Sequence, residues 1–234
     1  MENKICIIPA RGGSKRIPRK NIKDFFGKPI IAYSIQAAKN SGLFDEIMVS
    51  TDDTEIAEIA RQYGASIPFL RSEKNSDDFA TTADVLVEVL EKYAESGSHF
   101  VSACCIYPAA PLLTAAKLNE AFDILKSKEA FSIVPVSAFD FPIWRSLKIE
   151  NEKLKFIWPE NALKRSQDMV PAYHDCGQFY VFQVDSFMNE RKLFTERSYP
   201  LLMSGAEVQD IDNENDWQMA ELKYKILIKS NGKL

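Results

Sequence analysis

Long apolar segments are missing from this 234-residue chain. No hydrophobic run approaches the ~20 residues that a membrane-spanning helix needs. The short apolar stretch at residues 4–8 leads into a basic loop, without the longer apolar region and cleavage site of an export signal. The sequence therefore predicts a protein with no membrane anchor, no standard export signal and no membrane partner.

Cysteine is scarce, with four residues in the chain: Cys6, Cys104, Cys105 and Cys176. They form no C-x-x-C pair and show no Cys/His spacing typical of a metal site. This usage favours reduced thiols over a disulfide framework, and it predicts a cytoplasmic location.

A surplus of positive charge is also absent, because the formal net charge is -4 and the isoelectric point is near 5.4. Such a chain has no overall attraction for nucleic acid, so nucleic acid is not an expected partner and any anion must be held by a local basic cluster. Hydrophobic residues make up 46% and charged residues 26%, which is ordinary for a globular protein. The length fits a single domain over residues 1–234.

Several common nucleotide and nucleophile fingerprints are lacking. No G-x-x-x-x-G-K-S/T motif occurs, and Gly12-Gly13 does not fit G-x-G-x-x-G, which argues against kinases, ATPases and dinucleotide-dependent oxidoreductases. No G-x-S-x-G motif occurs either. His174, Asp175 and Cys176 are adjacent in sequence, and adjacent side chains rarely converge on one point, so covalent catalysis by Cys176 is disfavoured.

What the chain does contain is an alternation of strand and helix patterns. Continuous apolar runs typical of strands buried on both faces occupy residues 4–8, 46–51, 100–107, 131–136 and 178–182. Helical patterns occupy residues 30–41, 53–63, 81–95, 114–127 and 214–229. The order predicts an α/β fold with a mainly parallel sheet, flanking helices and a ligand crevice at the carboxyl ends of the strands.

An aromatic-rich segment at residues 139–159 interrupts this alternation. It contains Phe139, Phe141, Trp144, Phe156 and Trp158, with little clear periodicity. So many aromatic rings on a surface arm are unfavourable in water. The arm therefore either folds over the core or is covered by a partner subunit, and the residues alone leave both alternatives open.

A basic, glycine-containing loop directly follows the first predicted strand. It places Arg11, Lys15, Arg16, Arg19 and Lys20 within ten residues of two consecutive glycines. Glycine lets the backbone approach a ligand closely, and several cations together neutralise a polyanion such as a triphosphate. The alternative is a solvated basic loop, and the position at a strand end of an α/β sheet favours the phosphate site.

Two carboxylates, Asp210 and Asp212, stand near the C-terminus in the order Val208-Gln209-Asp210-Ile211-Asp212-Asn213. In an extended segment, alternate residues point to the same side, so this pair can hold one hard cation. Mg²⁺ commonly takes one or two protein carboxylates and fills its other positions with water and phosphate oxygens. The alternative is that Asp212 or Asn213 only caps the final helix.

The loop that runs from Ile8 to Lys15 as Ile-Pro-Ala-Arg-Gly-Gly-Ser-Lys, with Lys20-Asn21 behind it, resembles the signature of CMP-nonulosonate synthetases, the acylneuraminate cytidylyltransferase family. Matches continue in order through Leu70-Arg71, Tyr107-Pro108 and Asp210-Ile211-Asp212. The resemblance implies a Rossmann-like nucleotide-diphospho-sugar transferase fold, with a dimerisation insertion near residues 139–170 and a homodimer. It also implies direct attack of a sugar hydroxyl on the α-phosphorus of CTP.

The same resemblance implies roles for individual residues. Catalysis would rest on Arg11, Lys15, Asp210 and Asp212, and the two aspartates would carry Mg²⁺. The residues implied to bind CTP are Ala10, Arg11, Gly12, Gly13, Ser14, Lys15, Lys20, Asn21, Arg71, Thr81 and Thr82. The residues implied to bind the sugar are Tyr107, Arg165 and Gln178. No general base is identified.

One departure bears on the sugar. Sialate enzymes of the family typically read Gln-Pro-Thr-Ser-Pro-Leu-Arg in the central loop, where this chain has Tyr107 at the first position and Leu113 at the last. Losing an amide and a guanidinium makes that wall more apolar. The pattern is most similar to the branch that activates pseudaminic acid. N-acetylneuraminate or legionaminate activation, and a non-catalytic nucleotide-binding regulator, are the alternatives.

Overall fold

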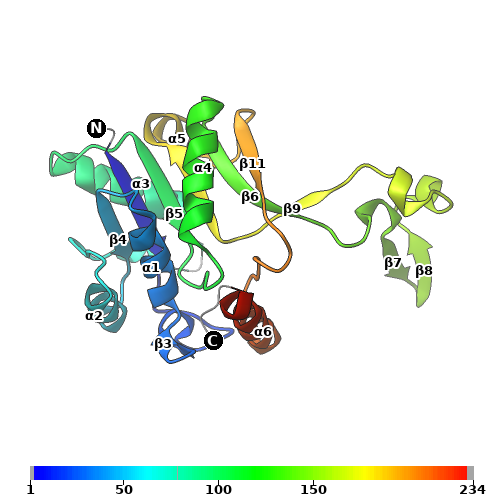
Figure 1. Ribbon diagram of the computed structural model, residues 1–234, viewed down its shortest axis with the longest axis horizontal. Helices are drawn as coiled ribbons and strands as arrows, with labels where there is room; N and C mark the ends of the chain where they lie inside the picture. The colour runs from blue at the N-terminus through cyan, green and yellow to red at the C-terminus, as the bar shows by residue number, and fades with distance from the viewer. Residues whose placement is uncertain (1–2, 78, 231–234) are drawn as a thin grey trace.

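The computed structural model describes residues 3–77 and 79–230, which form a central sheet flanked by helices (Figure 1). The sheet order is β11-β6-β10-β5-β1-β4, and β9 pairs with β6 outside this path. The strands are β1 (Lys4–Pro9), β4 (Glu46–Ser50), β5 (Ser102–Ile106), β6 (Ser132–Ala138), β9 (Tyr173–Asp175), β10 (Phe179–Gln183) and β11 (Ser198–Leu202).

Most strands of this sheet run in one direction. Strand β1 is parallel to both β4 and β5, and β11 is parallel to β6. Strands β10 and β9 are the exceptions, because β10 lies antiparallel between β5 and β6 and β9 is antiparallel to β6. The predicted α/β fold with a mainly parallel sheet is therefore confirmed. The apolar run of β10 could not reveal its direction, since a strand buried on both faces reads alike in either orientation.

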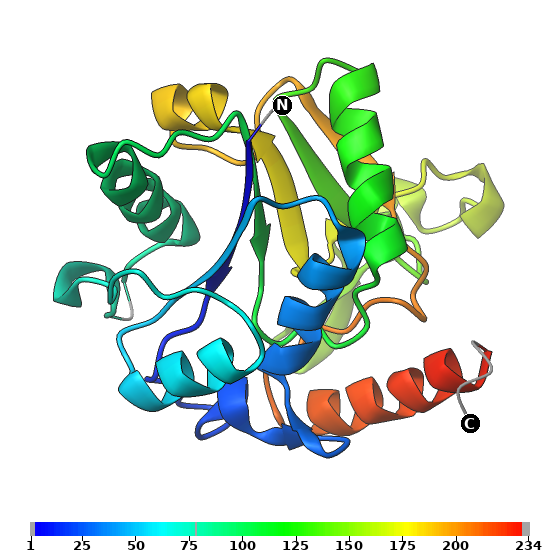
Figure 2. The same cartoon turned by 60° about the vertical axis from the view of Figure 1, so that its left-hand side comes forward.

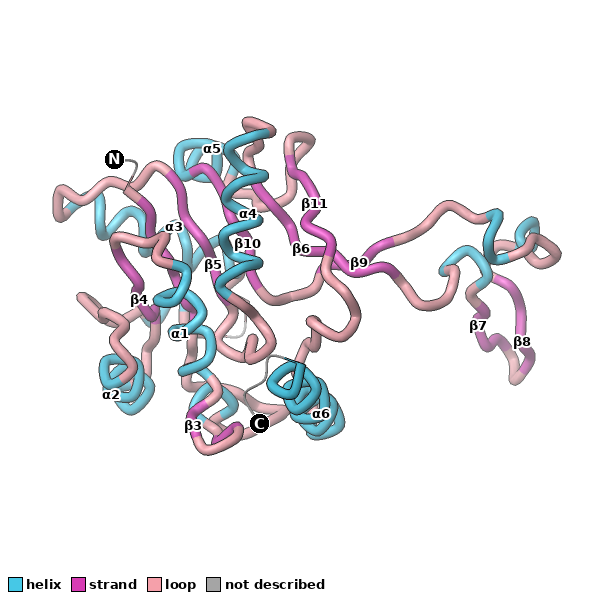
Figure 3. Tube along the Cα trace, viewed as in Figure 1, coloured by secondary structure: helices cyan, strands magenta, loops and turns pink. Residues whose placement is uncertain are grey.

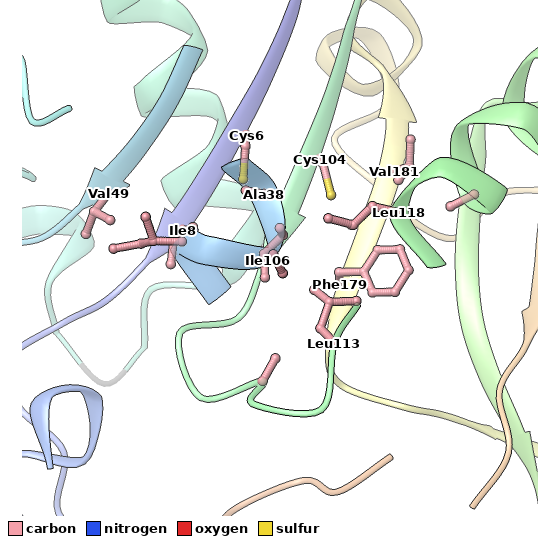
Figure 4. Packing of buried hydrophobic residues seen from close by; sticks show 14 of the residues in the cluster. Cys6, Ile8, Ala38, Val49, Cys104, Ile106, Leu113, Leu118, Phe179 and Val181 are labelled. Carbon is pink, nitrogen blue, oxygen red and sulfur yellow. The ribbon is translucent and has the colours of Figure 1, made fainter. Parts of the chain in front are cut away.

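Two helical layers cover the sheet. Helices α1 (Ile31–Ser41), α2 (Thr54–Gln62) and α4 (Ala115–Ser127) pack on one face, and α3 (Thr82–Glu95) and α5 (Val184–Glu190) pack on the other (Figure 2). Alternation along β1 divides its side chains between the layers. Cys6 and Ile8 join the first core, where Figure 4 shows Cys6 beside Cys104 and Ile8 between Val49 and Ile106. Ile5 and Ile7 join the second core.

The predicted helix starts are confirmed by their caps. The Asp53 carboxylate accepts the backbone N–H of Ile56 at 3.0 Å, and Thr81 forms a reciprocal capping box with Asp84. Thr114 caps α4. Helix α5 and strand β11 were not predicted. Helix α5 is short, and β11 is largely exposed and contains Pro200, so neither shows a strong periodic pattern.

The C-terminal helix α6 (Glu214–Ser230) packs against a small hairpin of β2 (Asp24–Phe25) and β3 (Lys28–Pro29). The Phe25 ring is fully buried and meets the rings of Tyr33, Trp217 and Tyr224 edge-on at centroid distances of 5.4 to 5.6 Å. This cluster also includes Ile17 and Ile211. It therefore joins the loop after β1 to the segment that precedes α6.

An arm leaves the body after β6 and returns at β9 (Figures 1 and 3). It carries a hairpin of β7 (Leu147–Glu150) and β8 (Lys153–Phe156). The Trp144 and Trp158 rings lie 5.6 Å apart, and the Trp144 indole N–H donates to the Val170 carbonyl at 2.9 Å. The arm does not fold over the core, which excludes one of the two sequence-based alternatives. None of the helices in the described residues is long and apolar enough to cross a membrane.

Candidate active site

A cleft of about 580 Å³ opens at the carboxyl ends of β1 and β5, which is where the α/β pattern predicted a ligand site. Four segments surround it: the loop after β1, the loop after β5, the start of β10 and the segment before α6. Its lining residues are Pro9, Arg11, Ser14, Lys15, Arg16, Ile17, Lys20, Asn21, Tyr107, Pro108, Ala109, Gly177, Tyr180, Asp210, Ile211 and Asp212.

The glycine loop is held in place by its neighbours. The backbone N–H of Gly12 donates to the Asp52 carboxylate at 3.0 Å, and a Cβ at Gly12 would lie 2.7 Å from the Asp53 carboxylate oxygen. A side chain at this position would therefore collide with the cap of α2, which explains the glycine. Buried Asn21 donates its amide to the Arg11 carbonyl at 2.9 Å and fixes the other side of the loop.

Cations from this loop gather at one side of the cleft. Arg11, Lys15, Arg16 and Lys20 all line it. The Lys20 ammonium donates to the Ile211 carbonyl at 2.6 Å, between the two aspartates. Burial lowers the pKa of Lys20, although Asp212 and Asp210 oppose that effect.

Arg19, the remaining cation of the loop, has a different position. It forms ion pairs with Asp53 and Glu55 at the start of α2 and does not line the cleft. The basic run therefore divides into a larger set that can meet a ligand and one arginine that anchors the loop. Whether a cation of this loop lines the cleft depends on the direction of its side chain. The sequence pattern does not predict that direction in an irregular loop.

The carboxylates Asp210 and Asp212 lie next to the same cations in the cleft. Arg16 forms an ion pair with Asp212 at 2.8 Å. Burial raises the pKa of Asp210, and the neighbouring charge of Asp212 raises it further. Both aspartates line the cleft, as the alternating pattern predicted, although the segment that carries them is a loop and not a strand.

The helix-capping alternative applies to the next residues. The Asn213 side chain accepts the backbone N–H groups of Asn215 and Asp216 at 2.9 and 3.1 Å. The Asp216 carboxylate accepts the backbone N–H groups of Asp212 and Asn213. Asn213 and Asp216 thus cap α6, and the carboxylates of Asp210 and Asp212 remain directed to the cleft.

The donor chemistry of this pair fits Mg²⁺. Two carboxylates that repel each other, next to cations and open to the cleft, match a cation that takes few protein ligands and completes its shell with water and phosphate oxygens. In the described part of the chain, no cluster of three or more His, Cys, Asp or Glu side chains could hold a metal. A site built wholly of protein ligands, as for structural zinc, is not formed there.

One wall of the cleft is aromatic and uncharged. Tyr107 and Tyr180 line it, with ring centroids 5.9 Å apart in an edge-to-face arrangement. The Tyr107 hydroxyl pairs with the Thr82 hydroxyl at 2.9 Å. The Tyr180 hydroxyl donates to the carboxylate of Asp175, the last residue of β9.

Several residues that the resemblance assigned to ligands lie outside the cleft lining. Arg71 is buried, and its guanidinium donates to the Ser50 hydroxyl oxygen at 3.0 Å and to the Ser50 carbonyl. Thr81 caps α3, and Thr82 reaches the cleft only through Tyr107. Ala10 is fully buried, and its N–H donates to the Ser50 carbonyl. Gly12 and Gly13 belong to the loop that supplies lining residues, but they do not line the cleft themselves.

Two residues assigned to the sugar have other contacts. The Gln178 amide donates to the Glu207 carbonyl at 2.8 Å, so it connects β10 to the segment that leads to Asp210. Arg165 lies on the arm, where its exposed guanidinium pairs with Asp168 at 2.8 Å. The arm extends away from the body of its own chain (Figure 1).

The adjacent trio His174, Asp175 and Cys176 forms no nucleophilic triad. Burial raises the pKa of the Cys176 thiol to about 12, which keeps it protonated near neutral pH. The His174 imidazole contacts the Asp175 carbonyl and stacks edge-on with Phe139 at 5.0 Å. The sequence-based rejection of covalent catalysis by Cys176 agrees with this geometry.

Some lining residues had no assigned role from the sequence, among them Arg16, Gly177 and Tyr180. Arg16 belongs to the basic run, which was a usable signal. Gly177 has a positive φ of 59°, and a Cβ there would lie 3.7 Å from Asp210. Nothing in the sequence alone reports the contact between Tyr180 and Asp175, because it depends on the register between β9 and β6.

Known proteins resemble this chain in sequence and in fold. Residues 5–222 match the family model described as cytidylyltransferase. A pseudaminic acid cytidylyltransferase from Campylobacter jejuni is 40% identical over 95% of this chain and 96% of its own length. A CMP-N,N'-diacetyllegionaminic acid synthase from Legionella pneumophila is 34% identical over 93% of this chain and 94% of its own length.

Solved structures extend the likeness to the fold. The structure of CMP:2-keto-3-deoxy-manno-octonic acid synthetase complexed with CTP superposes with a TM-score of 0.68 at 16% identity, covering 97% of this chain and 99% of that one. At this identity the likeness concerns the fold alone. It supports the nucleotide-diphospho-sugar transferase architecture that the sequence implied.

Proposed function

The chain belongs to the cytidylyltransferase family, and we propose that its cleft holds CTP and a nonulosonic acid side by side. The protein transfers CMP from CTP to the anomeric hydroxyl of that sugar and releases pyrophosphate. The relative from Campylobacter jejuni, 40% identical over nearly the full length of both chains, favours pseudaminic acid as the acceptor. One observation carries the proposal: four cations and two carboxylates line a single cleft.

The basic side of the cleft suits the triphosphate. Arg11, Lys15, Arg16 and Lys20 would neutralise its negative charge, and the glycine loop lets the backbone approach closely. The sugar hydroxyl attacks the α-phosphorus in line, and pyrophosphate leaves toward these cations. Phosphoryl-type transfer depends mainly on positioning and charge stabilisation, so no covalent enzyme intermediate is required.

The two carboxylates would hold Mg²⁺ against the phosphates. When bound there, the ion supplies charge neutralisation at the α-phosphate and leaving group. Asp210 and Asp212 provide its protein ligands, while Lys20 and Arg16 hold the segment and the Asp212 carboxylate in place. Arg71 would support the nucleotide through Ser50, and Thr82 would position Tyr107 on the uncharged wall.

The arm is best explained as a contact with a second copy of the chain. Leu163 is 99% exposed, Phe141 84% and Ile149 77%, and the arm also forms a groove of about 780 Å³ with apolar walls. Apolar surface of this extent favours burial against a partner. We place the dimer contact within residues 139–170, and Arg165 would then reach a sugar in the partner's cleft. The reduced thiols support a cytoplasmic location.

The experiment is to measure pyrophosphate release from CTP and Mg²⁺ with pseudaminic acid, N-acetylneuraminic acid, legionaminic acid or no sugar. We expect release that depends on the sugar and is fastest with pseudaminic acid. Faster release with another nonulosonic acid would correct the substrate and keep the chemistry. CTP binding without release for any sugar would overturn the catalytic proposal in favour of a nucleotide-binding regulator.

A further inference from the structure

The hydroxyl of Tyr180 is bound in a way that determines its hydrogen-bonding role. It donates its single proton to the Asp175 carboxylate. Burial raises the pKa of Tyr180, and the hydrogen bond to Asp175 raises it further, so the phenol keeps this proton. A phenol oxygen whose proton is engaged can only accept further hydrogen bonds.

The neighbouring Tyr107 is not restricted in this way. Its hydroxyl pairs with the Thr82 hydroxyl, and either oxygen can be the donor. Tyr107 can therefore donate or accept toward a ligand, according to which way the pair is turned. Of the two tyrosines on the uncharged wall, only Tyr180 has a hydroxyl that is fixed as a hydrogen-bond acceptor toward a ligand.

The position of Tyr180 in the cleft indicates that its hydroxyl would meet the sugar, the substrate that accepts CMP. Gly177, three residues earlier, packs against the Asp210 carboxylate, and Gly177 and Tyr180 line the same cleft. The cations that would hold the triphosphate line this cleft as well. An acceptor that lies against the uncharged lining residues next to Asp210 would therefore contact Tyr180.

We propose that Asp175 is a positioning residue that fixes the Tyr180 hydroxyl as a hydrogen-bond acceptor for an O–H or N–H group of the sugar. This inference rests on the proposed function, because it assigns the uncharged wall to the acceptor substrate. Asp175 itself stands behind the wall, in a second pocket that it shares with Asp140, His174 and Lys223. It acts on the sugar through Tyr180 alone.

A purely structural role for Asp175 is the competing explanation, because its other carboxylate oxygen accepts the backbone N–H of Gly177 at 2.9 Å. Losing that bond would disturb the turn beside Asp210 and would affect both substrates. A positioning role, by contrast, affects the sugar and leaves CTP binding unchanged. Separate KM values for the two substrates therefore distinguish the explanations.

The test compares Asp175→Ala, Tyr180→Phe and the double variant in steady-state pyrophosphate release. Asp123→Ala is the control, since it removes an exposed carboxylate on α4 that lines neither the cleft nor the second pocket. We expect each single variant to raise the KM for the sugar about 5- to 10-fold, the range for one lost hydrogen bond, with the KM for CTP unchanged. The double variant should be no worse than Tyr180→Phe, because Asp175 acts through that hydroxyl.

Asp175→Asn should restore most of the sugar affinity, because its amide oxygen can still accept the Tyr180 proton. Effects of the single variants that multiply in the double variant, or an equal rise in the KM for CTP, would overturn the inference and favour the structural role. An active wild-type enzyme whose sugar KM is unmoved by Tyr180→Phe would overturn it while leaving the proposed function intact. A wild-type enzyme inactive with every sugar would remove both.

Discussion

Asp210 combines a cost in stability with a role in the proposed chemistry. Its pKa is raised by burial and by Asp212, so its ionised form is less favourable in the folded protein than in the unfolded chain. A raised carboxyl pKa means that stability falls as the pH rises through the folded-state value. The protein therefore carries this electrostatic cost at a residue that would hold Mg²⁺ in the proposed reaction.

We predict that Asp210→Asn lowers kcat by at least ~100-fold, the scale of losing one major electrostatic contact at a reacting centre. Without Mg²⁺ at pH 7, its melting temperature should equal or exceed that of the wild type, because the buried charge is gone. Asp185→Asn, on α5, is the control and should change neither quantity. Full activity of Asp210→Asn at saturating Mg²⁺ would refute the metal assignment.

At the scale of elements, Glu88 connects α3 to the segment between α2 and α3. Burial raises the pKa of Glu88, but hydrogen bonds from Lys92, Ser72 and Asn75 outweigh it and lower the pKa to about 2. A lowered carboxyl pKa gives stability that is present above the ordinary value of 4.5 and is lost as the pH falls toward 2.

We therefore predict that Glu88→Gln destabilises the protein by roughly 2 kcal/mol at pH 7, the scale of losing hydrogen bonds to a charged group. Urea unfolding at a series of pH values measures the difference from wild type. The difference should shrink between pH 4.5 and 2. A difference that is constant across this range would show that packing, and not the charge, explains the effect.

The anchoring of α6 is a second prediction at this scale. Trp217 is 2% exposed and packs with Phe25 and Ile211, the residue between Asp210 and Asp212. Trp217→Ala should cost roughly 3–5 kcal/mol of stability and should also lower kcat. Phe187→Ala is the matched control, because Phe187 is equally buried but belongs to the core on the far face of the sheet. Equal kcat losses in both variants would mean that α6 does not position the carboxylates.

Sequence patterns predicted those elements whose signals are local. The buried runs of β1 and β5, the helix starts at Asp53 and Thr114, and the basic loop all rest on neighbouring residues. The reversed direction of β10, the bond from Lys20 to the Ile211 carbonyl and the contact between Tyr180 and Asp175 depend on tertiary arrangement. Side-chain pattern along one segment does not carry that information.

At the scale of the whole molecule, the arm exposes apolar side chains that no part of the same chain covers in the described residues. We predict that replacing Phe141 and Leu163 by Asp converts a dimer to a monomer in sedimentation equilibrium and raises the KM for the sugar, since Arg165 would no longer reach a partner's cleft. Leu70→Asp, an exposed apolar site on the body, is the control. A wild type that sediments as a monomer, or a monomeric variant with unchanged sugar KM, would contradict this assignment.

The central claim is that the anomeric oxygen of the sugar attacks the α-phosphorus of CTP directly. The measurement is the reaction of a nonulosonic acid labelled with ¹⁸O at its anomeric hydroxyl, followed by phosphorus NMR of both products. Direct attack predicts that the label is found in the oxygen that joins sugar to phosphorus in the CMP-sugar and that the pyrophosphate is unlabelled. An unlabelled bridging oxygen, or label in the pyrophosphate, would contradict it.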